Sequence, residues 1–160
     1  MNQTHIHLLI THLPIFGSIL GGLVLAHGLW TKSIQTKIAA YNILIISSLG
    51  AGIAYLTGEA AEETVENLQG IAKNMIDEHE DFAVFALVSL IILGVASLAG
   101  LFLTLGKSQL TKTIAIVVLF LSLISFGLVA ATGYLGGQIR HTEIHNSTTQ
   151  GQGGESERDE

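Results

Sequence analysis

The chain is 160 residues long, about the length of one domain. Hydrophobic residues make up 49% of it and charged residues only 12%, whereas a soluble domain carries about 25% charged residues, which indicates a membrane protein. The sequence has no cysteine, which excludes disulfides, thiolate metal sites, iron–sulfur clusters and covalently attached haem, and its net charge of −6 argues against nucleic acid as a partner.

Four apolar runs follow one another along the chain, each close to the roughly 20 residues that a helix needs to cross a bilayer. They cover residues 8–30, 38–57, 82–105 and 113–134. Because lipid cannot pair with backbone N–H and C=O groups, we expect each run to be a helix. The first run has no Lys or Arg before it and is too long for the apolar part of a signal peptide. We therefore expect it to be a retained membrane span. The fold class that we predict is therefore an all-α, up-down bundle of four transmembrane helices.

The polar segment 58–81, between the second and third spans, is not a simple loop. Its apolar residues recur at spacings of three and four, which is typical of an amphipathic helix: Val65, Leu68, Ala72, Met75 and Ile76. Gly70 interrupts this pattern, so we expect an amphipathic helical hairpin on the outer face, with an extension of the second span as the alternative. The tail 146–160 has no apolar residue, and we expect it to be disordered beside a membrane domain of residues 1–145. We expect no long internal repeat.

Charge divides the two sides of the predicted bundle. The loop between spans one and two and the loop between spans three and four contain no acid, but they contain Lys32, Lys37, Lys107 and Lys112. All 13 acids lie on the other side, with both termini and the segment 58–81. Cytoplasmic loops are enriched in Lys and Arg. We therefore predict a multi-pass protein of the bacterial inner membrane with both termini outside the cytoplasm.

Six of the seven histidines fall on the acidic side, and three of them can reach one shallow layer. His12 lies slightly more than one turn inside the first span, His79 directly before the third span, and His141 about two turns beyond the fourth. Ionisable groups at membrane depth face the bundle interior and suggest a functional site. His27 has no histidine partner on its own side, so we expect it to serve only as a hydrogen-bonding group.

A b-type haem is the first kind of site that suits this layer, because imidazoles on facing helices can ligate its iron from both sides. We expect His12 and His79 to be the axial ligands. Glycines would leave flat space for the porphyrin, and Gly17 and Gly21 form such a stripe below His12, although glycine stripes also serve as packing surfaces. The other residues expected at this site, including an arginine to pair with the propionates, are Gly133, Gly137, Arg140 and His141.

A non-haem ion bound by histidine and carboxylate is the second kind of site, and such mixed ligation suits Zn, Fe or Mn. The candidate ligands are His7, His12, His79, His141, Glu59, Glu62, Glu63 and Glu80. A third interpretation is a structural subunit of a membrane complex, in which the histidines serve only hydrogen bonding and assembly. The sequence contains no hydrolase, kinase or transferase motif, so nothing in it indicates an enzyme.

Motifs at the two ends of the membrane domain resemble those of the uncharacterised membrane family DUF2231. The opening His7-Leu-Leu-Ile-Thr-His12-Leu-Pro14-Ile is similar to the family's His-Pro-x-x-x-His-Phe-Pro-Ile. The close, from Gly133-Tyr-Leu-Gly-Gly-Gln138 to His141, is similar to its Gly-Tyr-Leu-Gly-Gly-Glu-Leu-x-x-x-His. Between them, Gly58-Glu-Ala-Ala-Glu-Glu63 and Glu78-His79-Glu80 resemble the family's middle.

The resemblance covers roughly residues 5–145 and implies a four-span membrane protein, sometimes associated with redox partners such as Rieske-type domains, but no established reaction. The chain has Leu8 where the family usually has Pro, and Gln138 where it usually has Glu, which weakens a ligand role for position 138. We therefore expect an integral membrane electron-transfer subunit with haem near its outer face. Its expected partners are the lipid bilayer and either other redox subunits or further copies of the chain.

Overall fold

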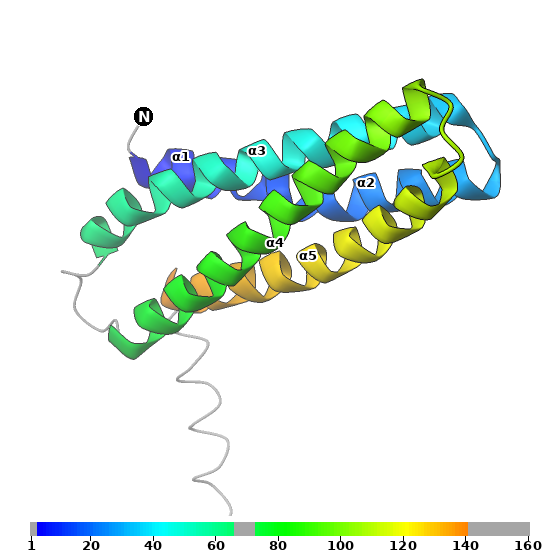
Figure 1. The fold of residues 1–160 in the computed structure, drawn as a ribbon. Coiled ribbons are helices and arrows are strands. Elements are labelled where there is room, and N and C mark those ends of the chain that lie inside the picture. Colours follow the sequence, from blue (N-terminus) through cyan, green and yellow to red (C-terminus); the bar gives the residue numbers. More distant parts are fainter. Residues whose placement is uncertain (1–2, 66–72, 141–160) are drawn as a thin grey trace, which may run out of the picture.

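The computed structural model describes the backbone of residues 3–65 and 73–140 and the side chains of residues 5–58 and 76–138. Its helices, in chain order, are α1 (Gln3–Ile10), α2 (His12–Trp30), α3 (Ile34–Val65), α4 (Lys73–Leu105) and α5 (Thr111–Arg140) (Figure 1). Four segments are long and apolar enough to cross a membrane: His5–Trp30, Ile34–Gly58, Ile76–Leu105 and Thr111–Gln138. Each contains one of the four expected spans, so the predicted all-α bundle of four membrane helices is confirmed.

The four long helices pack in a ring, in which α2 contacts α3, α3 contacts α4, α4 contacts α5, and α5 returns to α2. Consecutive helices run in opposite directions, so α2 and α4 occupy one diagonal of the bundle and α3 and α5 the other. The short helix α1 continues the first span and packs against α3 (Figure 1). We call the end at which α3 ends and α4 begins the acidic end, and the opposite end, with the loops 31–33 and 106–110, the lysine end.

Pro14 explains why the first span consists of two helices. Proline has no N–H to offer the carbonyl of Ile10, and its ring crowds that carbonyl, so the helix is interrupted one turn earlier, at Thr11. The carbonyl of Pro14 accepts a hydrogen bond from the Ser47 hydroxyl of α3 (3.3 Å). α1 packs against α3, and His7 lies on the side of α1 that faces it.

Small residues bring the helices close together in the middle of the bundle. A Cβ added at Gly17 would lie 2.7 Å from the Cβ of Ser47, and one at Gly21 would lie 2.6 Å from Cδ2 of Leu44. Membrane helices associate through such close packing because lipid tails are as apolar as the side chains. Of the two interpretations of this glycine pair, the contacts favour a packing surface against α3.

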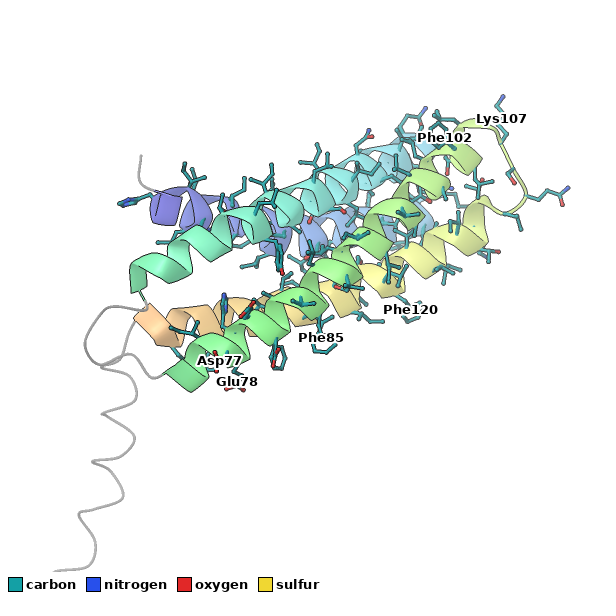
Figure 2. All side chains as sticks on the ribbon, turned by 60° about the vertical axis from the view of Figure 1, so that its left-hand side comes forward. Asp77, Glu78, Phe85, Phe102, Lys107 and Phe120 are labelled. Atoms are coloured by element: carbon teal, nitrogen blue, oxygen red, sulfur yellow. The ribbon has the colours of Figure 1, made fainter. Side chains whose placement is uncertain are left out.

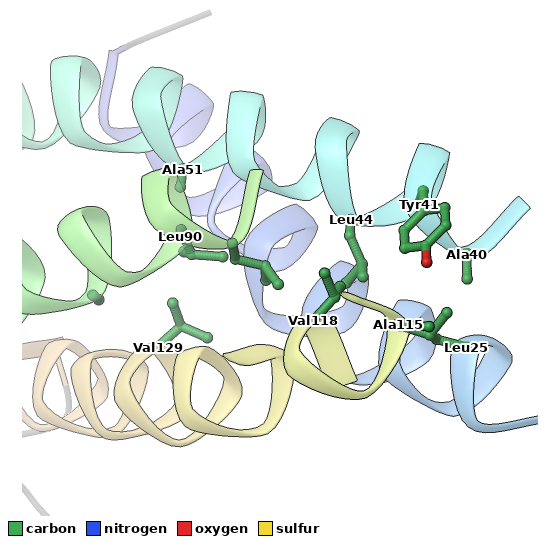
Figure 3. Close-up of a cluster of buried hydrophobic side chains, with 11 residues drawn as sticks. Leu25, Ala40, Tyr41, Leu44, Ala51, Leu90, Ala115, Val118 and Val129 are labelled. Carbon is green, nitrogen blue, oxygen red and sulfur yellow. The ribbon is translucent and has the colours of Figure 1, made fainter. Parts of the chain in front are cut away.

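Apolar side chains fill the core and also cover the outside. Leu25, Leu44, Leu90 and Val118 are buried between the helices, together with the aromatic ring of Tyr41 (Figure 3). The outward surface is mostly apolar, and the exposed rings of Phe85, Phe102 and Phe120 mark it in Figure 2. Asp77 and Glu78 lie near the acidic end and Lys107 at the lysine end (Figure 2). This distribution fits a bundle surrounded by lipid, with its charges at the two ends.

The helices extend well past the apolar runs at the acidic end. Residues 58–65 continue α3 and residues 73–81 belong to α4, so in the described part the polar segment lengthens two spans. Extension of the second span, one of the two expected forms, is therefore what α3 shows. Gly70 and the tail 146–160 lie outside the described residues.

The two loops at the lysine end share one geometry. Lys32 and Lys107 both have a left-handed backbone, with φ of 57° and 53°. A threonine hydroxyl then bonds to the serine that follows each lysine: Thr36 Oγ1 donates to Ser33 Oγ and Thr111 Oγ1 to the carbonyl of Ser108, both at 2.8 Å. Each loop therefore begins a new helix in a closely similar way.

This likeness continues into α3 and α5 and reveals an internal repeat with a period of 75 residues. Identical residues recur at that spacing: Lys32 and Lys107, Ser33 and Ser108, Thr36 and Thr111, Lys37 and Lys112, Ala40 and Ala115, Leu44 and Leu119, Ser47 and Ser122, Gly52 and Gly127, Thr57 and Thr132, and Gly58 and Gly133. The expectation of no long repeat is therefore wrong. The bundle consists of two similar helical hairpins, the first formed by α1, α2 and α3 and the second by α4 and α5.

Candidate metal centre

His7 is fixed against the second helix of its own hairpin. Its Nδ1 atom lies 2.9 Å from the carbonyl oxygen of Ala54 and 3.3 Å from the hydroxyl of Thr57. A carbonyl oxygen can only accept a hydrogen bond, so Nδ1 carries the ring hydrogen and donates it. The ring rests over Gly58, where an added Cβ would lie 3.3 Å from its Cε1 atom. When the ring is neutral, the other nitrogen, Nε2, is therefore the one that carries the lone pair.

His79 is held in the same way in the second hairpin. Its Nδ1 atom donates to the carbonyl oxygen of Thr132 on α5, at 3.0 Å. Its ring lies over Gly136, where an added Cβ would be 3.0 Å from Cε1 and 3.3 Å from Nδ1. In both hairpins the accepting carbonyl comes four residues before the glycine under the ring. The Nε2 atom of His79 is thus also the nitrogen that carries a lone pair.

The two histidines share one region at the acidic end of the bundle. His7 rests against Ala54 and Gly58 of α3, His79 lies in the second turn of α4, and both side chains are half-buried. Within residues 5–58 and 76–138, neither Nε2 atom takes part in a hydrogen bond. The structure thus places two half-buried imidazoles at one end of the bundle, one from each hairpin, and each donates its Nδ1 hydrogen to a backbone carbonyl.

The hydrogen bonding of the two histidines resembles that of metal ligands. Histidines that ligate metals generally donate their other ring N–H to a carbonyl or carboxylate, which fixes the orientation of the ring and raises the basicity of the ligating nitrogen. His7 and His79 both show this arrangement, with backbone carbonyls as the acceptors. The pair is therefore suited to bind a metal through its Nε2 atoms.

The structure does not bring His12 together with His79, the pair expected to be the axial ligands. His12 is exposed, its Nδ1 lies 2.7 Å from the carbonyl of Leu8, and its ring stacks on Phe16 with the centroids 6.1 Å apart. His7 and His12 are five residues apart, about 140° around a helix, so both cannot face the same neighbour. With α1 directed toward α3, it is His7 that faces inward.

The glycines of α5 also differ in their surroundings. Gly133 faces Ile15, 3.3 Å from an added Cβ, whereas Gly137 has no atom within 4 Å. The glycine under a histidine is Gly136, which the sequence interpretation missed by one position. The 75-residue repeat does not indicate it, because the repeat pairs Gly58 with Gly133.

The remaining candidates lie away from the pair or beyond the described side chains. Glu80 and His5 are exposed, and His27 is exposed with its ring edge against Trp30. Positions 59, 62 and 63 continue α3 and position 140 ends α5, but the side chains there are outside the described set, as is the whole of His141. Among the described residues, no group of three or more His, Asp or Glu side chains could hold a metal ion.

Comparison with known proteins adds no relative to this picture. No protein-family model, curated protein or solved structure matches the chain. The resemblance to DUF2231 therefore stays a prediction from its motifs, and the function is argued from the histidine pair itself.

Proposed function

We propose that this membrane protein binds a transition-metal ion at the acidic end of its bundle, with the Nε2 atoms of His7 and His79 as ligands. The observation that carries the proposal is the pair of hydrogen bonds from Nδ1 to backbone carbonyls, one in each hairpin. They leave Nε2 of each ring as the nitrogen that can ligate a metal when the ring is neutral.

The hydrogen bonding of the two rings favours metal binding over a purely structural role for the histidines. Placing an imidazole between helices near the membrane has a desolvation cost, and one hydrogen bond offsets only part of it. In both rings the second nitrogen is left as an acceptor without a partner in the described part of the chain. A bound metal ion would pair both acceptors at once.

Two imidazoles do not complete the coordination of Zn, Fe or Mn, so at least one further ligand is needed. Glu62 is one of the ligands expected from the sequence, and it lies in the part of α3 that follows the described side chains. Glu59 and Glu63 lie on the same turn, and His141 follows the last residue of α5. We propose that one of these groups is the third ligand.

A b-type haem is the second candidate, because one imidazole from each hairpin is also the ligand set of a bis-histidine haem. Gly137 favours it, since no atom lies within 4 Å of its added Cβ and it leaves a side-chain-free surface near the pair. His7 would then replace His12 as the second haem ligand beside His79. Arg140, the last residue of α5, would lie at the same end of the bundle as the two histidines. The bound haem would supply one-electron transfer, as expected of a redox subunit.

The test is metal and haem loading of the full chain purified in detergent. We expect one equivalent of Zn²⁺, Fe²⁺ or Mn²⁺ per chain after dialysis, and its loss in His7→Ala and His79→Ala. His12→Ala is the matched control and should keep the ion. A Soret band that is lost in the same two variants would assign the pair to haem. Full metal retention in both His7→Ala and His79→Ala would refute the proposal.

A further inference from the structure

Asn42 places a side-chain amide on the lipid-facing surface of α3. It is exposed and lies within the candidate span Ile34–Gly58. It comes five residues after Lys37, about 7.5 Å along the helix, so the amide lies inside the span and more than one helical turn from that charged residue. Within residues 5–58 and 76–138, the amide forms no hydrogen bond. In hydrocarbon, an amide without a partner is unfavourable.

The internal repeat shows that the fold does not require a polar group at this position. The residue equivalent to Asn42 is Val117 on α5, 75 residues later, and its side chain is 44% exposed. Val117 is an ordinary lipid-facing residue. The amide is therefore a special feature of α3, and it needs an explanation outside the single bundle.

The surface around Asn42 has the spacing of a helix–helix interface. From Asn42 toward the acidic end, exposed apolar residues follow at alternating steps of four and three: Ile46, Leu49, Ile53 and Leu56. Leu49 is 66% exposed and Leu56 is 77% exposed. Apolar residues at this heptad spacing form the contact stripe of packed parallel helices, and a single Asn within it fixes their register.

We propose that two copies of this chain pair through α3, with the Asn42 side chains hydrogen-bonded to each other across a two-fold axis along the membrane normal. Copies inserted in the same direction present α3 as parallel helices, so identical residues meet at equal depth. An amide has both a donor and an acceptor, which makes Asn42 complementary to itself. This self-complementarity argues for a second copy rather than a different membrane protein.

The absence of cysteine permits a clean test in the full chain. Single cysteines at Ile46, Leu49 and Ile53, oxidised in native membranes, should each give a disulfide-linked dimer. The matched control is Ile124→Cys on α5, which is equivalent to Leu49 in the repeat and is 58% exposed. It should give little dimer. Equal cross-linking of Leu49→Cys and Ile124→Cys would show random collision and overturn the proposal.

The role of the amide is tested in the Leu49→Cys background. Asn42→Val copies the residue of the other repeat and should reduce the cross-linked fraction at least fivefold, whereas Asn42→Gln, which keeps the amide, should retain most of it. Thermal unfolding of the Asn42→Val monomer in detergent should match that of the parent, since Val suits a lipid-facing position. An unchanged cross-linked fraction in Asn42→Val, or no dimer from any α3 cysteine, would overturn the pairing.

Discussion

His79 rests its imidazole directly on Gly136, so closely that a Cβ there would lie 3.0 Å from the ring carbon Cε1. Gly136→Ala should therefore displace the ring and weaken metal binding by roughly 10–100-fold, the usual effect of disturbing the groups that orient a metal ligand. Gly137→Ala is the matched control, because nothing lies within 4 Å of an added Cβ at that position. Titration against a chromophoric chelator measures both. Equal affinities of the two variants would contradict this placement of His79.

The contact between Gly17 and Ser47 predicts a loss of stability on enlargement. A Cβ at position 17 would meet the Cβ of Ser47 at 2.7 Å and its hydroxyl at 2.8 Å, and would push α2 away from α3. We expect Gly17→Ala to destabilise the bundle by about 1–3 kcal/mol. Gly52→Ala meets no atom within 4 Å and should leave stability unchanged or slightly raised. Thermal unfolding in detergent compares the two, and a more stable Gly17→Ala protein would refute the close approach.

The left-handed backbone of Lys107 predicts an unusual gain from glycine. A non-glycine residue in that conformation costs about 1–2 kcal/mol, and glycine's extra freedom in the unfolded chain offsets about half of the gain. Lys107→Gly should therefore stabilise the protein by about 0.5–1 kcal/mol, and Lys32→Gly should do the same in the equivalent loop. Lys112→Gly, inside α5, should instead destabilise it by about 1 kcal/mol. If the free energy of unfolding changed in the same direction in all three variants, the left-handed geometry of the loops would not explain the change.

The distribution of charge predicts the orientation in the membrane. Reporter fusions at Gln35 and Gln109, beside the lysines, should be cytoplasmic, and a fusion at Gln150 should be external. Alkaline phosphatase and fluorescent-protein fusions give opposite signals on the two sides. An active phosphatase at Gln35 would reverse the orientation and place the histidine pair in the cytoplasm.

The number, order and approximate length of the membrane helices followed from the sequence, because lipid imposes one requirement on every span: about 20 apolar residues in a helix. The internal repeat did not, although Lys32 and Lys107 begin identical spacings of Ser, Thr and Lys. Lipid-facing positions exchange Leu, Ile, Val and Ala freely, so the repeat is diluted along most of α3 and α5. The shared left-handed loops made the register visible.

The side chains at the site were predictable only in part. His79 was expected to face the interior, and it does. The choice between His7 and His12 depended on which side of the first span packs against α3, and hydrophobic periodicity does not reveal that side. Choosing Gly136 over Gly137 required the rotation of α5 against α4. Both decisions depend on tertiary packing, which a single helical segment does not encode.

The most direct test of the histidine pair is a count of coordinated imidazoles in the Cu²⁺-loaded protein. Pulsed electron paramagnetic resonance detects the remote Nδ1 nitrogen of each imidazole that ligates copper through Nε2, and combination lines distinguish one imidazole from two. We predict two imidazoles in the unmodified chain and in His12→Ala, and one in each of His7→Ala and His79→Ala. Two imidazoles in all four proteins, or none in the unmodified chain, would contradict a metal centre built on His7 and His79.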